Sequence, residues 1–359
     1  LGQTVQPIPH ITDEIKDRIK KAADGFDIAL IEIGGTIGDY ENMPFLFAVK
    51  GLEREIGKEN MCYALVSYLP VPGHITEMKT KPTQHAIKLL GEHGMVPDFI
   101  ICRAVRRLDD VRKHKIEVSA NISADRIISA PDTDILYQVP LDYEEEGVGG
   151  KVLDHLGLER KCDPDWGRWS ELLEHIRNPS HKVKIAMVGK YVEIGDYELT
   201  DSYISVNQSL EHAGANLDTQ VDISWIDSRK LEDEGAVEIL EQFDGIIVPG
   251  AFGEGGSEGV IEAIRYAREN KIPYLGLCYG MQMGVVEYAR NVVGLADANS
   301  AENDPDSPNA VIDIQFSQRE IIEEGRYGGT MRLGGYVAAL KRDSQVLALY
   351  EQTGRLEED

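Results

Sequence analysis

The chain has 359 residues, 42% of them hydrophobic, which suits two domains of ordinary size that each bury a core. Its net charge of −25 argues against a nucleic-acid-binding protein, because neutralising phosphates needs a basic face. No run of about 18 apolar residues predicts a membrane span, and no secretory signal opens the sequence. The four scattered cysteines indicate a reduced, cytoplasmic protein without a disulfide framework or zinc site.

The acidic residues are spread along the chain and are not gathered in one tail. This distribution is typical of a solvated surface. The alternative is adaptation to a salt-rich cytoplasm, in which screening relieves the repulsion between carboxylates.

The first part of the chain alternates helical and strand patterns. Thr12 is a candidate N-cap for a helix, and the apolar run Ile28–Ile33 predicts a buried parallel strand. Pro82 suits the first turn of a helix that runs toward Leu90. Two further strands are expected at Phe99–Cys102 and Arg126–Ser129.

Residues 164–181 have the composition of a linker, after which the alternation restarts. Strands are expected at Val183–Val188, Val221–Trp225, Gly245–Val248 and Tyr274–Leu277, and helices at Ser202–His212 and Glu258–Glu269. This order predicts an α/β protein with two doubly wound parallel-sheet domains, at 1–163 and 182–359.

Cys278 stands between Gly276 and Gly280 where the last of these strands meets the next helix. The G-x-C-x-G arrangement is the thiol version of the strained turn that presents a nucleophile at the end of a sheet. The positive end of the following helix favours the thiolate. The alternative is a packed cysteine at a strand end.

Pro249–Gly253 also follows a strand, and backbone N–H groups there could receive a developing oxyanion. The alternative is a plain strand-to-helix turn. Together with the G-x-C-x-G-M-Q run, this segment resembles the class I glutamine amidotransferases. The resemblance implies that Cys278 attacks glutamine to form a thioester, with Gly250, Ala251, Phe252 and Gly253 as the oxyanion loop. Ala251 replaces the family's usual second glycine.

The family also uses a histidine base, with a glutamate two residues later, on a strand that follows the cysteine. All nine histidines of this chain lie at or before His212. We therefore expect the histidine segment to lie outside the given sequence, and the alternative is a degenerate hydrolase.

Two polar signatures occupy the first half. Glu32 ends the apolar run and is followed by glycines and by Asp39, Tyr40 and Glu41. A carboxylate in that place can hold Mg²⁺ near phosphates, although acidic glycine loops are common. The run Lys79–Gln84 places two lysines before a proline-started helix, which suits polyphosphate; the alternative is a solvated basic turn.

Both signatures resemble those of the CTP synthase family, which is expected to carry a dethiobiotin-synthetase-like P-loop domain beside the glutaminase domain. The resemblance implies a magnesium ligand at Glu32 and a catalytic role for Lys79. It implies glutamine contacts by Phe252, Gln282, Glu302 and Arg332. It implies UTP or CTP contacts by Asp39, Tyr40, Glu41, Lys79, Lys81, Gln84 and Lys115.

The resemblance further implies an ATP-dependent ligase that aminates UTP with ammonia from glutamine. CTP would be a feedback inhibitor and GTP an allosteric activator. The family works as a homotetramer and can form filaments. Its N-terminal phosphate loop is expected to precede Leu1. Two alternatives remain: another ATP-dependent amidoligase with a glutaminase domain, and a non-catalytic regulatory or assembly homologue.

Overall fold

The computed structural model describes residues 4, 6–190, 193–194, 197–198, 203–233, 235–251, 253, 255–314 and 337–353. The chain divides into two compact units. Unit 1 comprises Leu1–His181 with His212–Gln220, and unit 2 comprises Lys182–Glu211 with Val221–Asp359. Among the described residues, no helix is long and apolar enough to cross a membrane.

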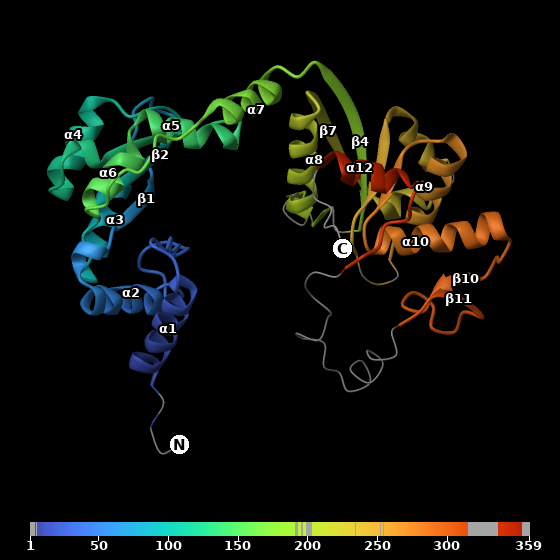
Figure 1. The fold of residues 1–359 in the computed structure, drawn as a ribbon, viewed down its shortest axis with the longest axis horizontal. Helices are drawn as coiled ribbons and strands as arrows, with labels where there is room; N and C mark the ends of the chain where they lie inside the picture. Colours follow the sequence, from blue (N-terminus) through green and yellow to red (C-terminus); the bar gives the residue numbers. More distant parts are fainter. Residues whose placement is uncertain are drawn as a thin grey trace. The chain divides into compact units, whose positions relative to one another are not determined.

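Unit 1 is built around a parallel sheet of β1 (Ala64–Tyr68), β2 (Phe99–Ala104) and β3 (Ile127–Pro131), in that order. The predictions of β2 and β3 are confirmed, whereas β1 had not been predicted. Its helices, shown in blue to green in Figure 1, are α1 (Thr12–Ala23), α2 (Met43–Ile56), α3 (Lys81–Glu92), α4 (Asp110–Ala120), α5 (Val139–Glu145), α6 (Val148–His155) and α7 (Gly167–Arg177).

Thr12 is the first residue of α1 and not its N-cap, which is Ile11. The Thr12 hydroxyl instead donates to the Pro9 carbonyl at 2.7 Å. The segment predicted as a linker, at 164–181, contains α7, whose Trp169 indole donates to the Tyr137 carbonyl at 2.7 Å.

The prediction of a strand at Ile28–Ile33 is wrong in this structure. The segment has no strand assignment, and Leu30 is 96% exposed. A parallel strand is held by neighbours that accept and donate its backbone hydrogen bonds. None of the three described strands of this sheet pairs with the segment. Ile33 and Ile37 pack instead against a small core that includes Leu90.

Unit 2 contains a four-stranded sheet in the order β7-β4-β8-β9. Its strands are β4 (His181–Gly189), β7 (Thr219–Asp227), β8 (Gly245–Val248) and β9 (Tyr274–Gly276). The β4–β8 and β8–β9 pairs are parallel. The predicted strands are therefore confirmed to within a few residues.

The helices of this unit are α9 (Ser257–Asn270), α10 (Tyr279–Tyr288) and α12 (Gln345–Thr353), together with the part of α8 (Ile204–Asn216) that ends at Glu211. Predicted helices correspond to α8 and α9, although Ser202 lies outside the described residues. The α10 helix contacts β8, β9 and the small parallel pair β10 (Ala298–Ser300) and β11 (Asn309–Ile312), beside which it lies in Figure 1. A short antiparallel pair joins β5 (Glu193–Ile194) and β6 (Tyr197–Glu198).

Short 3₁₀ or π segments complete the described elements: η1 (Pro7–Ile11), η2 (Lys58–Asn60), η3 (Ala124–Arg126), η4 (Leu136–Gln138), η6 (Ser228–Leu231), η7 (Ala236–Gln242) and η8 (Ala289–Val293). The core of unit 2 lies between the sheet and its helices and includes Val248, Ile264, Tyr279 and Met283. Val248 is the last residue of β8 and Tyr279 is the first of α10, so β8 ends beside the start of α10 in this core. The β9 strand ends at Gly276, three residues before the same point of the chain.

Candidate active site and nucleotide-binding residues

Cys278 sits in the turn between β9 and α10 with φ 52° and ψ −100°. An L-residue rarely adopts this backbone conformation, which costs on the order of 1–3 kcal/mol and persists only where surrounding bonds impose it. Two such bonds flank the cysteine: the Leu277 N–H donates to the Val248 carbonyl at 2.9 Å, and the Gln282 N–H donates to the Cys278 carbonyl at 3.1 Å. The thiol belongs to an exposed residue, so it is presented to solvent.

The flanking glycines are required by close backbone contacts. A Cβ on Gly276 would lie 2.5 Å from the Gly280 carbonyl carbon, and one on Gly280 would lie 2.2 Å from the Val248 carbonyl oxygen. Neither distance leaves room for a methyl group. The G-x-C-x-G pattern is therefore a steric requirement of this turn, as the sequence had indicated.

The predicted oxyanion loop lies against the nucleophile. A Cβ placed on Gly250 would be 3.7 Å from Cys278 Cβ. Ala251 is 7% exposed and belongs to the core of unit 2, so its extra methyl group is buried in that core. Gly253 has φ +78°, and its N–H donates to Glu302 Oε1 at 2.9 Å. Phe252 lies outside the described residues.

Lys190, directly after β4, joins this loop to the nucleophile helix, and it is not among the predicted site residues. Its ammonium donates to the Gly253 carbonyl, to Tyr279 Oη at 2.8 Å and to Ser257 Oγ at 3.2 Å. It also lies 4.1 Å from the centroid of the Tyr279 ring, which suits a cation–π contact. The amide of Asn303 donates to the same Tyr279 Oη at 3.2 Å. A lone charge just after a predicted strand was the available sequence signal.

Of the residues expected to hold glutamine, the structure describes Gln282 and Glu302. Glu302 is exposed and reaches the oxyanion loop through its bond to Gly253. Gln282 is half-buried in the first turn of α10, one turn beyond Cys278. Arg332 lies outside the described residues. The structure therefore brings Cys278, the loop and Glu302 together, and its geometry suits attack by a thiolate on a carbonyl beside backbone donors.

In unit 1, two predicted nucleotide contacts meet on one carboxylate. Glu77 lies 3.1 Å from the Lys79 ammonium and 3.6 Å from the Lys115 ammonium. The hydrogen bond from Lys79, together with the nearby positive charges, lowers the pKa of Glu77 below its ordinary value. Lys81 begins α3 and is exposed, while the Gln84 amide donates to Thr80 Oγ1 at 3.2 Å.

The other signature forms a separate exposed loop. Asp39 Oδ2 accepts from the Thr36 N–H at 3.1 Å, and Asp39, Glu41 and Glu32 are all exposed, as is Tyr40 at 89%. Gly38 approaches Leu89, which lies eight residues, or about 12 Å of helix, from the start of α3. Within the described ranges, no hydrogen bond or ion pair joins this loop to Lys79, Lys81 or Lys115.

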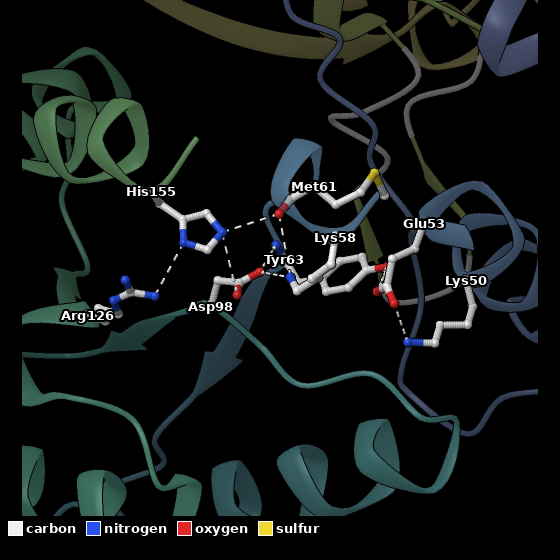
Figure 2. A network of polar contacts seen from close by, with 8 residues as sticks. All are labelled: Lys50, Glu53, Lys58, Met61, Tyr63, Asp98, Arg126 and His155. Carbon is white, nitrogen blue, oxygen red and sulfur yellow. Dashed lines mark hydrogen bonds and ion pairs between the residues drawn. The ribbon is translucent and has the colours of Figure 1, made fainter. Parts of the chain in front are cut away.

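Glu32 belongs to none of the potential metal-ligand groups of three or more side chains found among the described residues. The one such group is Cys62, Asp98 and His155. Figure 2 shows that the Asp98 carboxylate is already engaged: its Oδ2 accepts from the Tyr63 N–H at 2.8 Å and from Lys58.

The two ring nitrogens of His155 are engaged as well. Nε2 lies 3.2 Å from the Met61 carbonyl, to which it donates, and this leaves Nδ1 to accept from Arg126 at 3.4 Å (Figure 2). No nitrogen lone pair remains for a metal. Burial and the neighbouring Asp98 raise the pKa of the Cys62 thiol, which further disfavours the ligating thiolate. We therefore assign this network to the stability of unit 1.

Comparison with known proteins identifies both halves of the chain. Residues 1–158 match the family described as CTP synthase N-terminus, and residues 198–352 match the family described as glutamine amidotransferase class-I. A CTP synthase of Methanopyrus kandleri is 46% identical over 98% of this chain and 65% of its own length. A CTP synthase of Methanocaldococcus jannaschii is 46% identical over 98% of this chain and 64% of its own.

A solved structure, the glutaminase domain of Trypanosoma brucei CTPS with bound acivicin, is 44% identical in sequence. The match covers 38% of this chain and 52% of the chain in the solved structure, with a TM-score of 0.35. The chain thus spans slightly less than two thirds of the length of the curated relatives that it matches.

Proposed function

The chain belongs to the CTP synthase family, and on that basis we propose that the protein aminates UTP to CTP, using ATP and ammonia released from glutamine. The observation that carries the proposal is the Cys278 turn, in which a strained cysteine faces a backbone loop, in a chain whose other half matches the CTP synthase N-terminus. The curated relatives are CTP synthases, which favours this function over that of another amidoligase.

In the glutaminase half-reaction, the Cys278 thiolate attacks the carboxamide carbon of glutamine, and the C–S bond forms as the carbonyl electrons move to oxygen. Backbone N–H groups of Gly250–Gly253 stabilise this oxyanion. The C–N bond then breaks, the amide nitrogen takes a proton and leaves as ammonia, and water hydrolyses the thioester to glutamate. The chain carries no histidine after Cys278, so we assign no base to this step.

The glutamine itself would be held by charges that match an α-amino acid. Glu302 suits the ammonium group and Arg332 the carboxylate, with Gln282 and Phe252 beside them. In support of this, Glu302 lies within hydrogen-bond distance of the Gly253 N–H. Glutamine would replace that internal contact when it binds.

In the synthase half-reaction, ATP transfers its γ-phosphoryl group to O4 of UTP, and ammonia then attacks C4 and displaces phosphate. Catalysis of phosphoryl transfer depends mainly on positioning and on stabilising charge. We assign the stabilisation of the moving phosphoryl group to Lys79. We assign contacts with UTP to Lys81, Gln84 and Lys115, and contacts with inhibitory CTP to Asp39, Tyr40 and Glu41.

Glu32 supplies one exposed carboxylate. Mg²⁺ is commonly held by one or two carboxylates together with substrate phosphates, and this donor set fits that mode. We therefore propose Glu32 as a magnesium ligand in the nucleotide complex, where the metal would neutralise phosphate charge. Activation by GTP, a homotetramer that can form filaments, and a cytoplasmic location are proposed from family membership.

The test is CTP formation from UTP and ATP by the purified protein, with glutamine and then with ammonia. Cys278→Ala should abolish the glutamine-driven reaction and leave the ammonia-driven one. Cys162→Ala is the matched control, because Cys162 is also an exposed free cysteine. Absence of CTP with both nitrogen sources in the unmodified protein would refute the synthase proposal and favour a non-catalytic homologue.

A further inference from the structure

Glu77 lies at the centre of a cluster of cationic side chains in unit 1, which we call the Glu77 cluster. Its members are Lys79, Arg106, Arg112 and Lys115 with the carboxylates of Glu77 and Asp109. We propose that Arg112 completes an anion site with Lys79 and Lys115, and that Glu77 occupies this site until a polyphosphate displaces it. The identification of that polyphosphate as UTP rests on the proposed function.

The geometry places one carboxylate against three cations from two segments. Glu77 Oε1 lies 2.7 Å from Arg112 Nη2 and 3.6 Å from Lys115 Nζ, while Oε2 lies 3.1 Å from Lys79 Nζ. Lys79 stands two residues before the start of α3, whereas Arg112 and Lys115 lie on one side of α4, three residues apart. A single anion is therefore enough to hold the ends of both helices together.

Arg112 is built into this cluster more firmly than the lysines. Its side chain is 19% exposed, compared with 41% for Lys79 and 50% for Lys115. Asp109, the N-cap of α4, fixes it through an Nη1–Oδ2 contact of 3.0 Å and accepts from its backbone N–H at 2.8 Å. The guanidinium is thus oriented in advance, which lowers the entropic cost of binding an anion.

One donor of Arg112 remains without a partner. Its Nε atom is buried and makes no hydrogen bond within the described part of the chain. A buried donor left unsatisfied is costly and points to a missing acceptor. An additional oxygen next to the Nη2–Glu77 contact would satisfy it, and a phosphate offers two oxygens at the spacing of a guanidinium edge.

The charge of the cluster points in the same direction. The whole chain carries −25, yet here four cations gather around two carboxylates. Arg106 adds its charge by donating to the carbonyl of Thr76, next to Glu77. Cations that crowd together repel one another, so their arrangement is favourable when an anion of higher charge than one carboxylate binds.

A carboxylate also cannot satisfy all the donors that face it. Two lysines and one arginine carry about eleven N–H donors in total, and Arg112 Nη1 already contacts Asp109, whereas Glu77 offers about four lone-pair sites. A triphosphate presents more oxygens and a larger charge. It would therefore take over the cluster, and Glu77 would turn toward solvent, where it is already 42% exposed.

The test is calorimetric titration of the 359-residue chain with sodium tripolyphosphate and, separately, with UTP, at low salt with Mg²⁺ chelated. Glu77→Gln should tighten tripolyphosphate binding about tenfold, which corresponds to about 1.4 kcal/mol, because the competing anion is lost. Arg112→Gln should weaken it by a similar factor. Glu14→Gln and Arg18→Gln are the controls, since they make the same charge changes in an exposed pair on α1.

If Arg112→Gln does not fold, Glu77→Gln is a sufficient test, because the Glu77 side chain is 42% exposed and its replacement leaves no cavity in the core. Unchanged or weaker binding by Glu77→Gln would overturn the inference, as would an Arg112→Gln response equal to that of Arg18→Gln. If the variants respond to tripolyphosphate but UTP does not bind, the anion site stands and the proposed function fails. If UTP binds equally to all the variants, the function stands and the anion site fails.

Discussion

Replacement of Gly280 by alanine tests the steric account of the nucleophile turn. The new methyl group would lie 2.2 Å from the Val248 carbonyl oxygen, more than 1 Å short of the 3.4 Å at which ordinary contact begins. The obstacle is backbone of a core strand and cannot swing aside. Overpacking of this kind costs up to about 3 kcal/mol, while alanine in place of glycine inside a helix returns about 1 kcal/mol. The net loss is about 2 kcal/mol.

Gly284, one turn later in α10, provides the matched control. A methyl group there would lie 3.8 Å from Tyr274 Cε1, which is an ordinary contact. Gly284→Ala should therefore stabilise the helix by about 1 kcal/mol, so that the two variants differ by about 3 kcal/mol. The same substitution in the same helix thus has opposite effects.

Urea unfolding of unit 2 would measure this difference through Trp225, after Trp166 and Trp169 of unit 1 are replaced by phenylalanine. At a typical slope of about 2–3 kcal/mol per molar urea, the two midpoints should differ by about 1 M. Equal midpoints for the two variants would refute the argument that the Val248 carbonyl excludes a side chain at position 280.

Three further outcomes follow from the described contacts. Lys190→Met should lower kcat of the glutamine-driven reaction roughly tenfold, because it releases the Gly253 carbonyl. Ammonia-driven CTP formation should be unchanged, and Lys190→Arg should partly restore the glutamine-driven rate. An equal loss in both reactions would contradict the positioning role. Iodoacetamide at pH 8, followed by peptide mass mapping, should label Cys162 and spare Cys102. Burial raises the pKa of the Cys102 thiol to about 12, so about one molecule in ten thousand carries the reactive thiolate. Rapid labelling of Cys102 in the folded protein would contradict this expectation. Asp227→Asn should cost about 1 kcal/mol at pH 7, because a neutral amide keeps the cap of η6 but loses the charge-assisted bonds from the Arg229 guanidinium, whose Nε donates to Asp227 Oδ1 at 3.0 Å. The hydrogen bond from Arg229 lowers the pKa of Asp227 in the folded protein. The contribution of Asp227 to the free energy of unfolding is therefore complete above the ordinary pKa of 3.8 and is lost as the pH falls through the lower folded value. A difference in unfolding free energy between the two proteins that is the same at pH 2 as at pH 7 would contradict this assignment.

The parts of the site that were predictable from sequence are those fixed by neighbouring residues. The turn at Cys278 depends on contacts within a few positions, and both glycines are required where the pattern placed them. Strands β2, β3, β4, β8 and β9 were also predictable, because most of them are short apolar runs bounded by turn residues. Continuous apolar character predicts burial well when the sheet supplies neighbours on both sides.

Pairing between strands was the property that the pattern could not supply. Ile28–Ile33 has the apolar run of a buried strand but no partner among the described strands, so Leu30 is exposed. The β1 strand shows the reverse case. Only Leu65 within it is buried, so the strand has no run of consecutive buried residues that a local pattern could reveal. Yet it pairs with β2 residue by residue.

The roles of charged residues were the hardest to predict from sequence, because they depend on contacts with residues that are distant in the chain. Lys190 reaches Gly253 across 63 positions, and Arg112 reaches Glu77 across 35, so neither could be separated from a solvated surface charge by local pattern. In an acidic chain, however, the cost of bringing like charges together is informative once the fold reveals it. Four cations lie around Glu77 and Asp109, and one buried guanidinium donor of Arg112 has no hydrogen-bond acceptor among the residues that the structure describes. A bound anion explains this arrangement better than the stability of unit 1 alone.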